Sequence, residues 1–144
     1  MLTGLAATAA TALVGCSANT LLPADASGDS GSGTTSCGNN LCLDLNDAAN
    51  AALTMVDGSL VVAAPTDRLI VIRTSMTELI ALSDVCTHAG CGVRYDRVNK
   101  ALTCPCHGSR YALTGAVTRG PANRALAVYP TQLDAATNVV TITL

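Results

Sequence analysis

The sequence predicts a small all-β protein, an antiparallel β-sandwich or open barrel, and three observations support this. Short runs rich in Val, Ile and Leu are bounded by Asp, Gly, Pro or Asn, which is the pattern of strands and hairpins. The 144 residues include three Tyr but no Phe or Trp, so aliphatic side chains must build the core. We find no internal repeat and no long amphipathic helix. The length suits one domain with a modest core.

The expected strands are four β-branched runs, at residues 60–63, 68–73, 78–82 and 138–144. The pair Asp57-Gly58 marks a hairpin turn just before the first run. Residues 95–104 indicate a second hairpin that turns near Asn99 and Lys100. This hairpin would place the segments on either side of it next to each other.

Those two segments are the most informative part of the chain, and we call them the first box (residues 86–91) and the second box (residues 104–109). Each offers one thiol and one imidazole, from Cys86 and His88 and from Cys104 and His107. Such a set suits a [2Fe–2S] centre in which one iron takes two Cys and the other two His. It would equally suit a tetrahedral structural zinc.

The two boxes resemble those of Rieske iron–sulfur proteins, in their spacing, in the additional Cys that each contains and in the Ser and Tyr that follow. The resemblance implies one [2Fe–2S] cluster held by Cys86 and Cys104 on the buried iron and by His88 and His107 on the outer iron. It also implies a Rieske-type sandwich or open barrel with a small cluster-binding subdomain.

The same resemblance implies that the additional cysteines form a disulfide between the boxes, Cys91 with Cys106. The alternative is that both are free, buried thiols. A disulfide closing a loop of about 15 residues is worth roughly 3 kcal/mol in the chain-entropy model. It would also indicate an oxidising compartment.

Ser109 and Tyr111 match the segment in which high-potential family members place hydroxyl donors to cluster sulfurs. Such bonds favour the reduced state, so we expect a potential toward the upper part of the Rieske range of about −150 to +300 mV. Alternatively, Ser109 caps a turn and Tyr111 fills core. The segment 120–122, Gly-Pro-Ala, resembles the proline loop that covers the cluster. Ala89 stands where bc-type members commonly have Leu, which alters the expected shielding or docking surface.

The resemblance points to the high-potential branch that includes cytochrome bc-type proteins and the arsenite oxidase small subunit. It implies a one-electron, proton-coupled carrier in a quinol-oxidising or other respiratory chain, an electron-transfer protein or subunit rather than a complete enzyme. Redox proteins such as cytochromes or oxidoreductase subunits, and quinol, are the expected partners. Three alternatives stay open: the small subunit of a periplasmic oxidase of the arsenite oxidase type, a dioxygenase ferredoxin, and a zinc-stabilised binding module.

The N-terminal segment predicts export. Residues 1–15 look like part of a lipoprotein-type signal: Leu2–Val14 is apolar and too short to span a bilayer, and Leu13–Cys16 resembles a lipobox. Cys16 is therefore a candidate for lipidation, with an ordinary secretory segment as the alternative. We expect the protein on the periplasmic side of a bacterial membrane, held there by a lipid anchor.

Residues 16–36 have the Ser, Gly, Thr and Asn composition of a linker, and residues 37–144 form the expected domain, with a cluster-binding subdomain at about 84–122. Cys37 and Cys42 are close enough in sequence to form a second disulfide in an exported protein.

Charge is uneven although the net charge is only −2. Between Cys91 and Arg124 one acid, Asp96, stands against six basic residues: Arg94, Arg97, Lys100, Arg110, Arg119 and Arg124. This basic collar either steers an acidic partner or is the solvated side of hairpins. The near-neutral whole and the export segment argue against nucleic acid as a partner.

Overall fold

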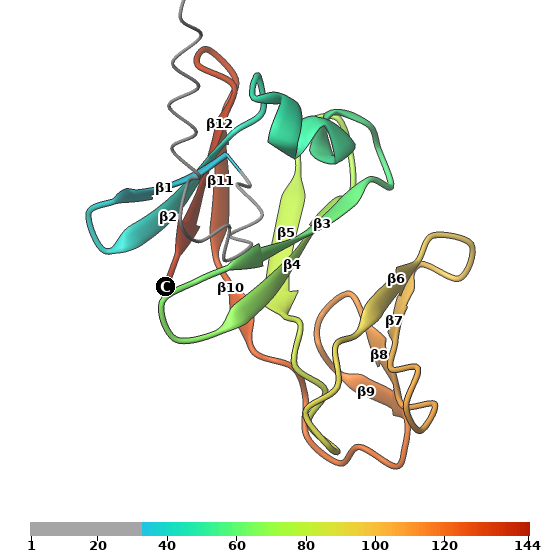
Figure 1. Cartoon of the computed structure of the whole chain (residues 1–144). Helices are drawn as coiled ribbons and strands as arrows, with labels where there is room; N and C mark the ends of the chain where they lie inside the picture. Colours follow the sequence, from blue (N-terminus) through green and yellow to red (C-terminus); the bar gives the residue numbers. More distant parts are fainter. Residues whose placement is uncertain (1–32) are drawn as a thin grey trace, which may run out of the picture.

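The computed structural model describes residues 33–144, which form three four-stranded antiparallel sheets and one short helix (Figure 1). The all-β antiparallel fold predicted from the sequence is therefore confirmed. The expected signal segment, Cys16 and most of the expected linker lie outside the described residues. Within residues 33–144, no helix has the length and apolar character needed to cross a membrane.

Two of the sheets pack face to face as a sandwich, in the upper part of Figure 1. The first sheet has the order β1-β2-β12-β11 and the second β10-β5-β4-β3. Their strands are β1 (Thr34–Cys37), β2 (Asn40–Asp44), β3 (Ser59–Ala63), β4 (Arg68–Arg73), β5 (Leu79–Ser83), β10 (Val128–Tyr129), β11 (Thr131–Asp134) and β12 (Val139–Thr143). The core between them is aliphatic, as the composition requires, and contains Leu41, Leu43, Leu53, Val62, Leu69, Val71, Val140 and Ile142.

Strand β4 is covered on both faces. Leu69 and Val71 point into the sandwich core, whereas Ile70 and Ile72 belong to a second core below it. Successive side chains of a strand point to opposite faces, so a strand covered on both sides reads as a continuous apolar run. This explains why residues 68–73 show no polar alternation.

The third sheet is the separate body at the lower right of Figure 1, with the order β6-β7-β8-β9. Its strands are short: β6 (Arg94–Asp96), β7 (Ala101–Thr103), β8 (Arg110–Ala112) and β9 (Val117–Arg119). The β6–β7 hairpin turns through residues 97–100 as expected, with Lys100 at a φ of 49°. The inner face of this sheet packs against the lower face of β4 and β5 through the second core.

The turn at Asp57-Gly58 differs from the prediction, because a helix and not a strand precedes it. The alanine-rich segment Ala48–Thr54 forms a 3₁₀ helix, η1. The Asp47 side chain caps it by accepting from the Ala49 N–H at 2.9 Å. The buried Arg73 donates to the Leu53 carbonyl at 3.0 Å, satisfying one of the carbonyls at the helix end. The Asp57-Gly58 turn then leads into β3.

Strand β1 begins at Thr34, inside the segment expected to be linker up to residue 36. Its polar, Thr-rich sequence carries no hydrophobic alternation, so only its pairing identifies it as a strand. It pairs with β2, and the Cys37–Cys42 disulfide joins the two strands with a Cα–Cα distance of 5.9 Å.

Asp57 connects the sandwich to the third sheet. Its carboxylate accepts from the Tyr95 hydroxyl at 2.9 Å and forms an ion pair with Lys100. Lys100 and Tyr95 together lower the pKa of Asp57, the lysine having the larger effect. Burial and the neighbouring carboxylate raise the pKa of Tyr95 to about 12. The β6–β7 hairpin is thus held to the η1–β3 turn by a polar contact outside the apolar core.

We predict that Tyr95→Phe makes the protein less sensitive to alkali. An unfolded Tyr ionises near pH 10, whereas folded Tyr95 keeps its proton until about pH 12. Stability falls as pH rises between these values, because the unfolded chain has lost a proton that the native state retains. Urea unfolding from about pH 9 to about pH 11 should give a shallower fall in the free energy of unfolding for the variant. Equal slopes would contradict the Tyr95–Asp57 contact.

Candidate metal centre

Each box forms a loop with the same backbone geometry. In the first, the Gly90 N–H donates to the Cys86 carbonyl at 2.8 Å; in the second, the Gly108 N–H donates to the Cys104 carbonyl at 3.0 Å. The two glycines have φ values of 73° and 77°, in the left-handed region that favours glycine. Each loop is closed at its base, by bonds of 2.8 Å from Cys86 N to Cys91 O and from Cys104 N to Ser109 O.

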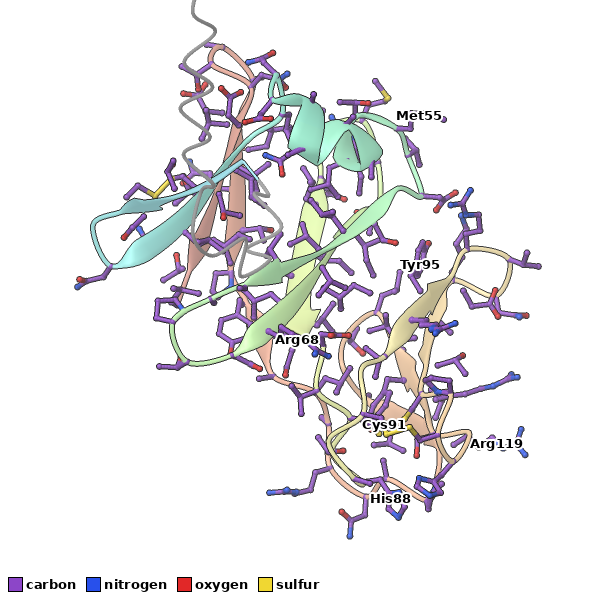
Figure 2. All side chains as sticks on the ribbon, viewed as in Figure 1. Met55, Arg68, His88, Cys91, Tyr95 and Arg119 are labelled. Atoms are coloured by element: carbon purple, nitrogen blue, oxygen red, sulfur yellow. A yellow bond between two sulfur atoms is a disulfide. The ribbon has the colours of Figure 1, made fainter. Side chains whose placement is uncertain are left out.

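The two loops place the four candidate ligands at one end of the molecule, with the thiols inside and the imidazoles outside. Cys86 and Cys104 are free and buried, at 2% and 1% exposure, and each thiol affects the pKa of the other. His88 and His107 are exposed, and their ring centroids lie 4.7 Å apart in an edge-to-face arrangement. Figure 2 shows His88 at the lower tip.

The surroundings of the two sulfurs differ. Burial raises the pKa of the Cys86 thiol, but the Tyr111 hydroxyl and the backbone N–H groups of His88 and Ala89 outweigh it, so the net shift is downward. At Cys104, burial and the neighbouring Cys86 raise the pKa of the thiol above its usual value. Loop amides of Cys106 and His107 oppose this rise. Backbone N–H groups therefore point at both sulfurs and favour their thiolate forms.

Tyr111 comes from β8 and reaches the first box. Its hydroxyl oxygen accepts from the Thr87 N–H at 3.2 Å and lies 3.2 Å from the Cys86 sulfur and 3.1 Å from Thr87 Oγ1. Thr87 Oγ1 donates its own proton to the Arg124 carbonyl at 2.7 Å. The Tyr111 proton is therefore free to point at either Thr87 Oγ1 or the Cys86 sulfur, and a thiolate is the stronger acceptor.

The segment around Gly120–Ala122 contacts both boxes. The Ala122 N–H donates to Ser109 Oγ at 3.0 Å, and both residues are buried. The Thr87–Arg124 bond fixes the same segment to the first box. The proline loop expected from the sequence is therefore held against both boxes by these two hydrogen bonds. Ser109 serves it as an acceptor, and its hydroxyl proton stays available for a bond to another group.

A disulfide joins the two loops, between Cys91 of the first box and Cys106 of the second, with a Cα–Cα distance of 6.5 Å. The sulfurs of Cys91, Cys104 and Cys106 all lie within 4.8 Å of one another. Because disulfide sulfurs are not thiolate ligands, this trio is no metal site of its own. Only Cys104 among the three can bind a metal.

The residues present fit an iron–sulfur centre. Two thiols from separate loops meet in a buried position, amides face them, and two imidazoles stand together outside. This is the donor set of a [2Fe–2S] cluster with two Cys on one iron and two His on the other. The structure places the six residues suggested for cofactor binding in the two boxes or on the strand that follows the second box: Cys86, His88, Cys104, His107, Ser109 and Tyr111.

Thr87 is a site residue that the sequence analysis missed. It lies between two candidate ligands, but nothing in the box spacing indicates that its hydroxyl reaches Arg124, 37 residues along the chain. The register of β7 with β8 brings Tyr111 beneath it, and this register cannot be read from motifs.

A groove of about 740 Å³ opens beside the first box. Its walls include His88, Ala89, Asp67 and Arg124. The small side chain of Ala89 is exposed, so one flank of His88 is accessible from the groove. Solvent or a partner can therefore reach this imidazole without displacing a bulky residue.

An antiparallel β-fold that carries a paired Cys/His centre at its tip defines an all-β metalloprotein of the iron–sulfur type. The profile of the Rieske [2Fe–2S] domain matches residues 47–130, more than half of the chain. The chain belongs to the Rieske [2Fe–2S] family, as the boxes suggested. It is a Rieske electron-transfer protein with a [2Fe–2S] cluster as its cofactor.

Sequence relatives are subunits of cytochrome b6-f complexes. The cytochrome b6-f complex iron-sulfur subunit 1 of Nostoc sp. (strain PCC 7120 / SAG 25.82 / UTEX 2576) is 35% identical over 108 residues, which cover 72% of this chain and 59% of that protein. The iron-sulfur subunit of Synechococcus sp. (strain JA-3-3Ab) is 43% identical over 65 residues, covering 45% of this chain and 38% of that subunit. The matched regions thus span between about a third and three fifths of these relatives.

Solved structures agree with this assignment. The plasma membrane Rieske protein PetC3 from Synechocystis PCC 6803 has 34% identity and a TM-score of 0.55, covering 60% of this chain and 87% of PetC3. The ferredoxin of carbazole 1,9a-dioxygenase from Nocardioides aromaticivorans IC177 has 19% identity and a TM-score of 0.54, covering 62% of this chain and 86% of that ferredoxin. This second likeness shows the common fold alone.

We predict that removing either disulfide lowers the stability of the protein, but that only removing Cys91–Cys106 also speeds loss of the cluster. In the chain-entropy model, removing Cys91–Cys106, with a sequence separation of 15, costs about 3 kcal/mol, and removing Cys37–Cys42, with a separation of 5, costs about 2 kcal/mol. Only the first joins the two boxes. Cys91→Ala/Cys106→Ala should therefore also speed cluster loss, followed as visible absorbance, whereas the control Cys37→Ala/Cys42→Ala should not. Equal rates of loss in both would contradict the assigned role.

Proposed function

We propose that this protein is an exported, membrane-tethered carrier that performs one-electron, proton-coupled transfer in a quinol-oxidising or other respiratory chain. The observation that carries the proposal is the layered donor set, with buried thiols beneath exposed imidazoles on two matching loops. When bound, the [2Fe–2S] cluster supplies a one-electron redox couple. The protein's part is to hold this group at the tip, where partners reach it.

Cys86 and Cys104 are the proposed ligands of the buried iron, and His88 and His107 of the outer iron. Burial of both thiols and exposure of both imidazoles support this assignment. The matching glycine turns support it further, because each turn aims amides at the sulfur of its own cysteine. The imidazoles are the groups that meet a quinol or a redox protein at the surface.

Tyr111 and Ser109 are the proposed hydroxyl donors that raise the potential. Tyr111 is completely buried and its hydroxyl is 3.2 Å from the Cys86 sulfur. A hydrogen bond to a thiolate strengthens as negative charge builds up on reduction. Ser109 is also completely buried, and its proton has no acceptor among the described residues that would compete with a cluster sulfur.

Redox proteins of a cytochrome bc-type complex are the proposed partners, with quinol as the reductant. The curated relatives are cytochrome b6-f subunits, and one solved relative is a plasma membrane protein, which supports a membrane setting. The lipobox-like residues 13–16 support a lipid anchor at Cys16, followed by a tether, on the periplasmic side. The two disulfides fit an oxidising compartment.

Low-temperature EPR of the full chain reconstituted with iron and sulfide tests the proposed centre. After reduction with dithionite we expect the rhombic spectrum of a His-ligated cluster, at a lower average g value than an all-Cys cluster gives. The same spectrum after reduction with ascorbate would place the protein in the high-potential class. No paramagnetic signal, together with stoichiometric zinc binding, would contradict the proposal in favour of a zinc-stabilised module.

We predict that Tyr111→Phe lowers the reduction potential. If the hydroxyl bond to Cys86 strengthens by about 1 kcal/mol on reduction, its loss lowers a one-electron potential by about 40 mV. The potential is measured by EPR-monitored titration. Tyr129→Phe is the matched control, since it removes a half-buried hydroxyl that donates to the Asp67 carboxylate at 2.8 Å and not to a sulfur.

An unchanged potential in Tyr111→Phe, or an equal fall in Tyr129→Phe, would contradict the role of Tyr111. Ser109→Ala is a less selective variant, because it also removes the acceptor of the Ala122 N–H. Its effect on the potential therefore combines a lost donor with a loosened proline loop.

A further inference from the structure

Three arginines lie in one row across the third sheet. The strand register pairs Arg94 with Thr103, Thr103 with Arg110, and Arg110 with Arg119. The last pair lies beside a β-bulge, because Tyr111 pairs with Val117. Residues directly opposite one another on neighbouring strands place their side chains on the same face of a sheet. We call Arg94, Arg110 and Arg119 the arginine row.

The row lies on the open face of the sheet. The adjacent cross-strand positions face the other way and pack into the second core. They are Tyr95, Leu102 and Tyr111. All three arginines are exposed, and the intervening position is a short Thr. The next row on this face holds Asp96, Ala101 and Ala112, so one carboxylate and two small side chains flank the guanidinium groups. The result is an exposed, basic face of the sheet.

The arginine row forms no ion pair within the part of the chain that the structure describes. Among residues 33–144, the ion pairs join Arg68 to Asp84 and Lys100 to Asp57, and none involves the arginine row. Asp96 is the one acid of this sheet. Its carboxylate accepts from the Val98 and Asn99 backbone N–H groups and from the Asn99 side chain, which hold it in the hairpin turn.

Like charges directly opposite each other on neighbouring strands destabilise a sheet. Arg110 and Arg119 form such a pair. Arg110 helps to lower the pKa of Asp96, so this single carboxylate offsets part of the repulsion. The remaining repulsion is a local electrostatic cost of the fold. An anionic surface placed against the row would offset it.

The row is also next to the metal centre. Thr103 directly precedes Cys104, and Arg110 directly follows Ser109, so the row crosses the base of the second box. Figure 2 shows Arg119 projecting from the same end of the molecule as His88. A protein bound to the row would therefore lie close to the exposed imidazoles.

Charge is unevenly distributed over residues 33–144, with the basic residues gathered in the segment that carries the two boxes. Residues 91–124 carry six basic residues and one acid, a net charge of +5, whereas the other residues between 33 and 144 carry two basic residues and seven acids, a net of −5. Such a separation of charge orients the molecule as it approaches an acidic surface, with the cluster end forward.

We propose that the arginine row is the docking surface for an acidic redox protein that exchanges electrons with the cluster. This inference rests on the proposed electron-transfer function and adds the chemistry of the partner: a carboxylate-rich patch around its own redox centre. Arginine suits such a contact, because its planar guanidinium binds carboxylates with two parallel hydrogen bonds. An exposed sheet face fits a protein surface better than a small anion, which needs an enclosing site.

The test uses one electron acceptor in two charge forms: native horse cytochrome c, which is basic, and its succinylated form, whose lysines carry carboxylates. Binding to the full-length holoprotein is measured by surface plasmon resonance, and electron transfer by stopped flow, at low and at high ionic strength. We expect the succinylated form to bind more tightly and react faster at low salt, with both advantages lost at high salt.

Arg94→Gln/Arg110→Gln/Arg119→Gln should slow the reaction with the succinylated form at low salt by about tenfold or more. The matched controls change one charge at a time: each single row variant is compared with Arg97→Gln, which lies in the hairpin turn outside the row. Each row variant should weaken binding more than Arg97→Gln does. Equal effects would overturn the proposal, because they would reflect net charge alone.

Binding to lipid vesicles distinguishes a surface that docks a protein from one that binds a membrane. Loss of binding to phosphatidylglycerol vesicles in the triple variant, with unchanged binding of succinylated cytochrome, would overturn the proposal in favour of a membrane contact. Binding without electron transfer would support the docking surface and count against the proposed function. Unchanged EPR spectra in all variants would confirm that the cluster end remains intact.

Discussion

The register of β7 with β8 is the constraint on which the rest of the site depends. It pairs Leu102 with Tyr111 and Thr103 with Arg110, and so closes the second box at its base. A slip of one residue would reverse the faces of the strand. Tyr111 would then leave the Cys86 sulfur and turn to solvent, while Arg110 would enter the second core. One hairpin register therefore fixes the loop, the buried hydroxyl and the outer charges together.

The loops themselves have few apolar contacts, so polar and covalent links define their geometry. The Cys91–Cys106 disulfide connects the boxes, and the Thr87–Arg124 and Ala122–Ser109 bonds hold the proline segment against both. Within the boxes, Cys86 and Cys104 are the residues that pack into the second core. This division leaves the imidazoles outside, where an electron carrier needs them.

Much of the fold and most of the site could be predicted from the sequence, because both rest on local signals. Residues 68–73 form a strand as their β-branched run indicates, and the residue types and spacing of the two boxes indicate the proposed ligands. Helix η1 was missed because it is one short 3₁₀ segment, and β1 because its Thr-rich sequence depends on pairing with β2. Thr87 and the arginine row depend on contacts between distant segments, which no local pattern encodes.

Strands β4 and β5 contribute side chains to both cores, so the two cores are expected to unfold together. Val71 and Ala81 face the sandwich, whereas Ile72 and Leu82 support the cluster end. Separating the cluster end would expose one whole face of the strand pair to water, so that end has little freedom to unfold alone. We expect the amides of β4 and β5 to exchange with deuterium most slowly, and the redox centre to be lost in the same cooperative event as the sandwich.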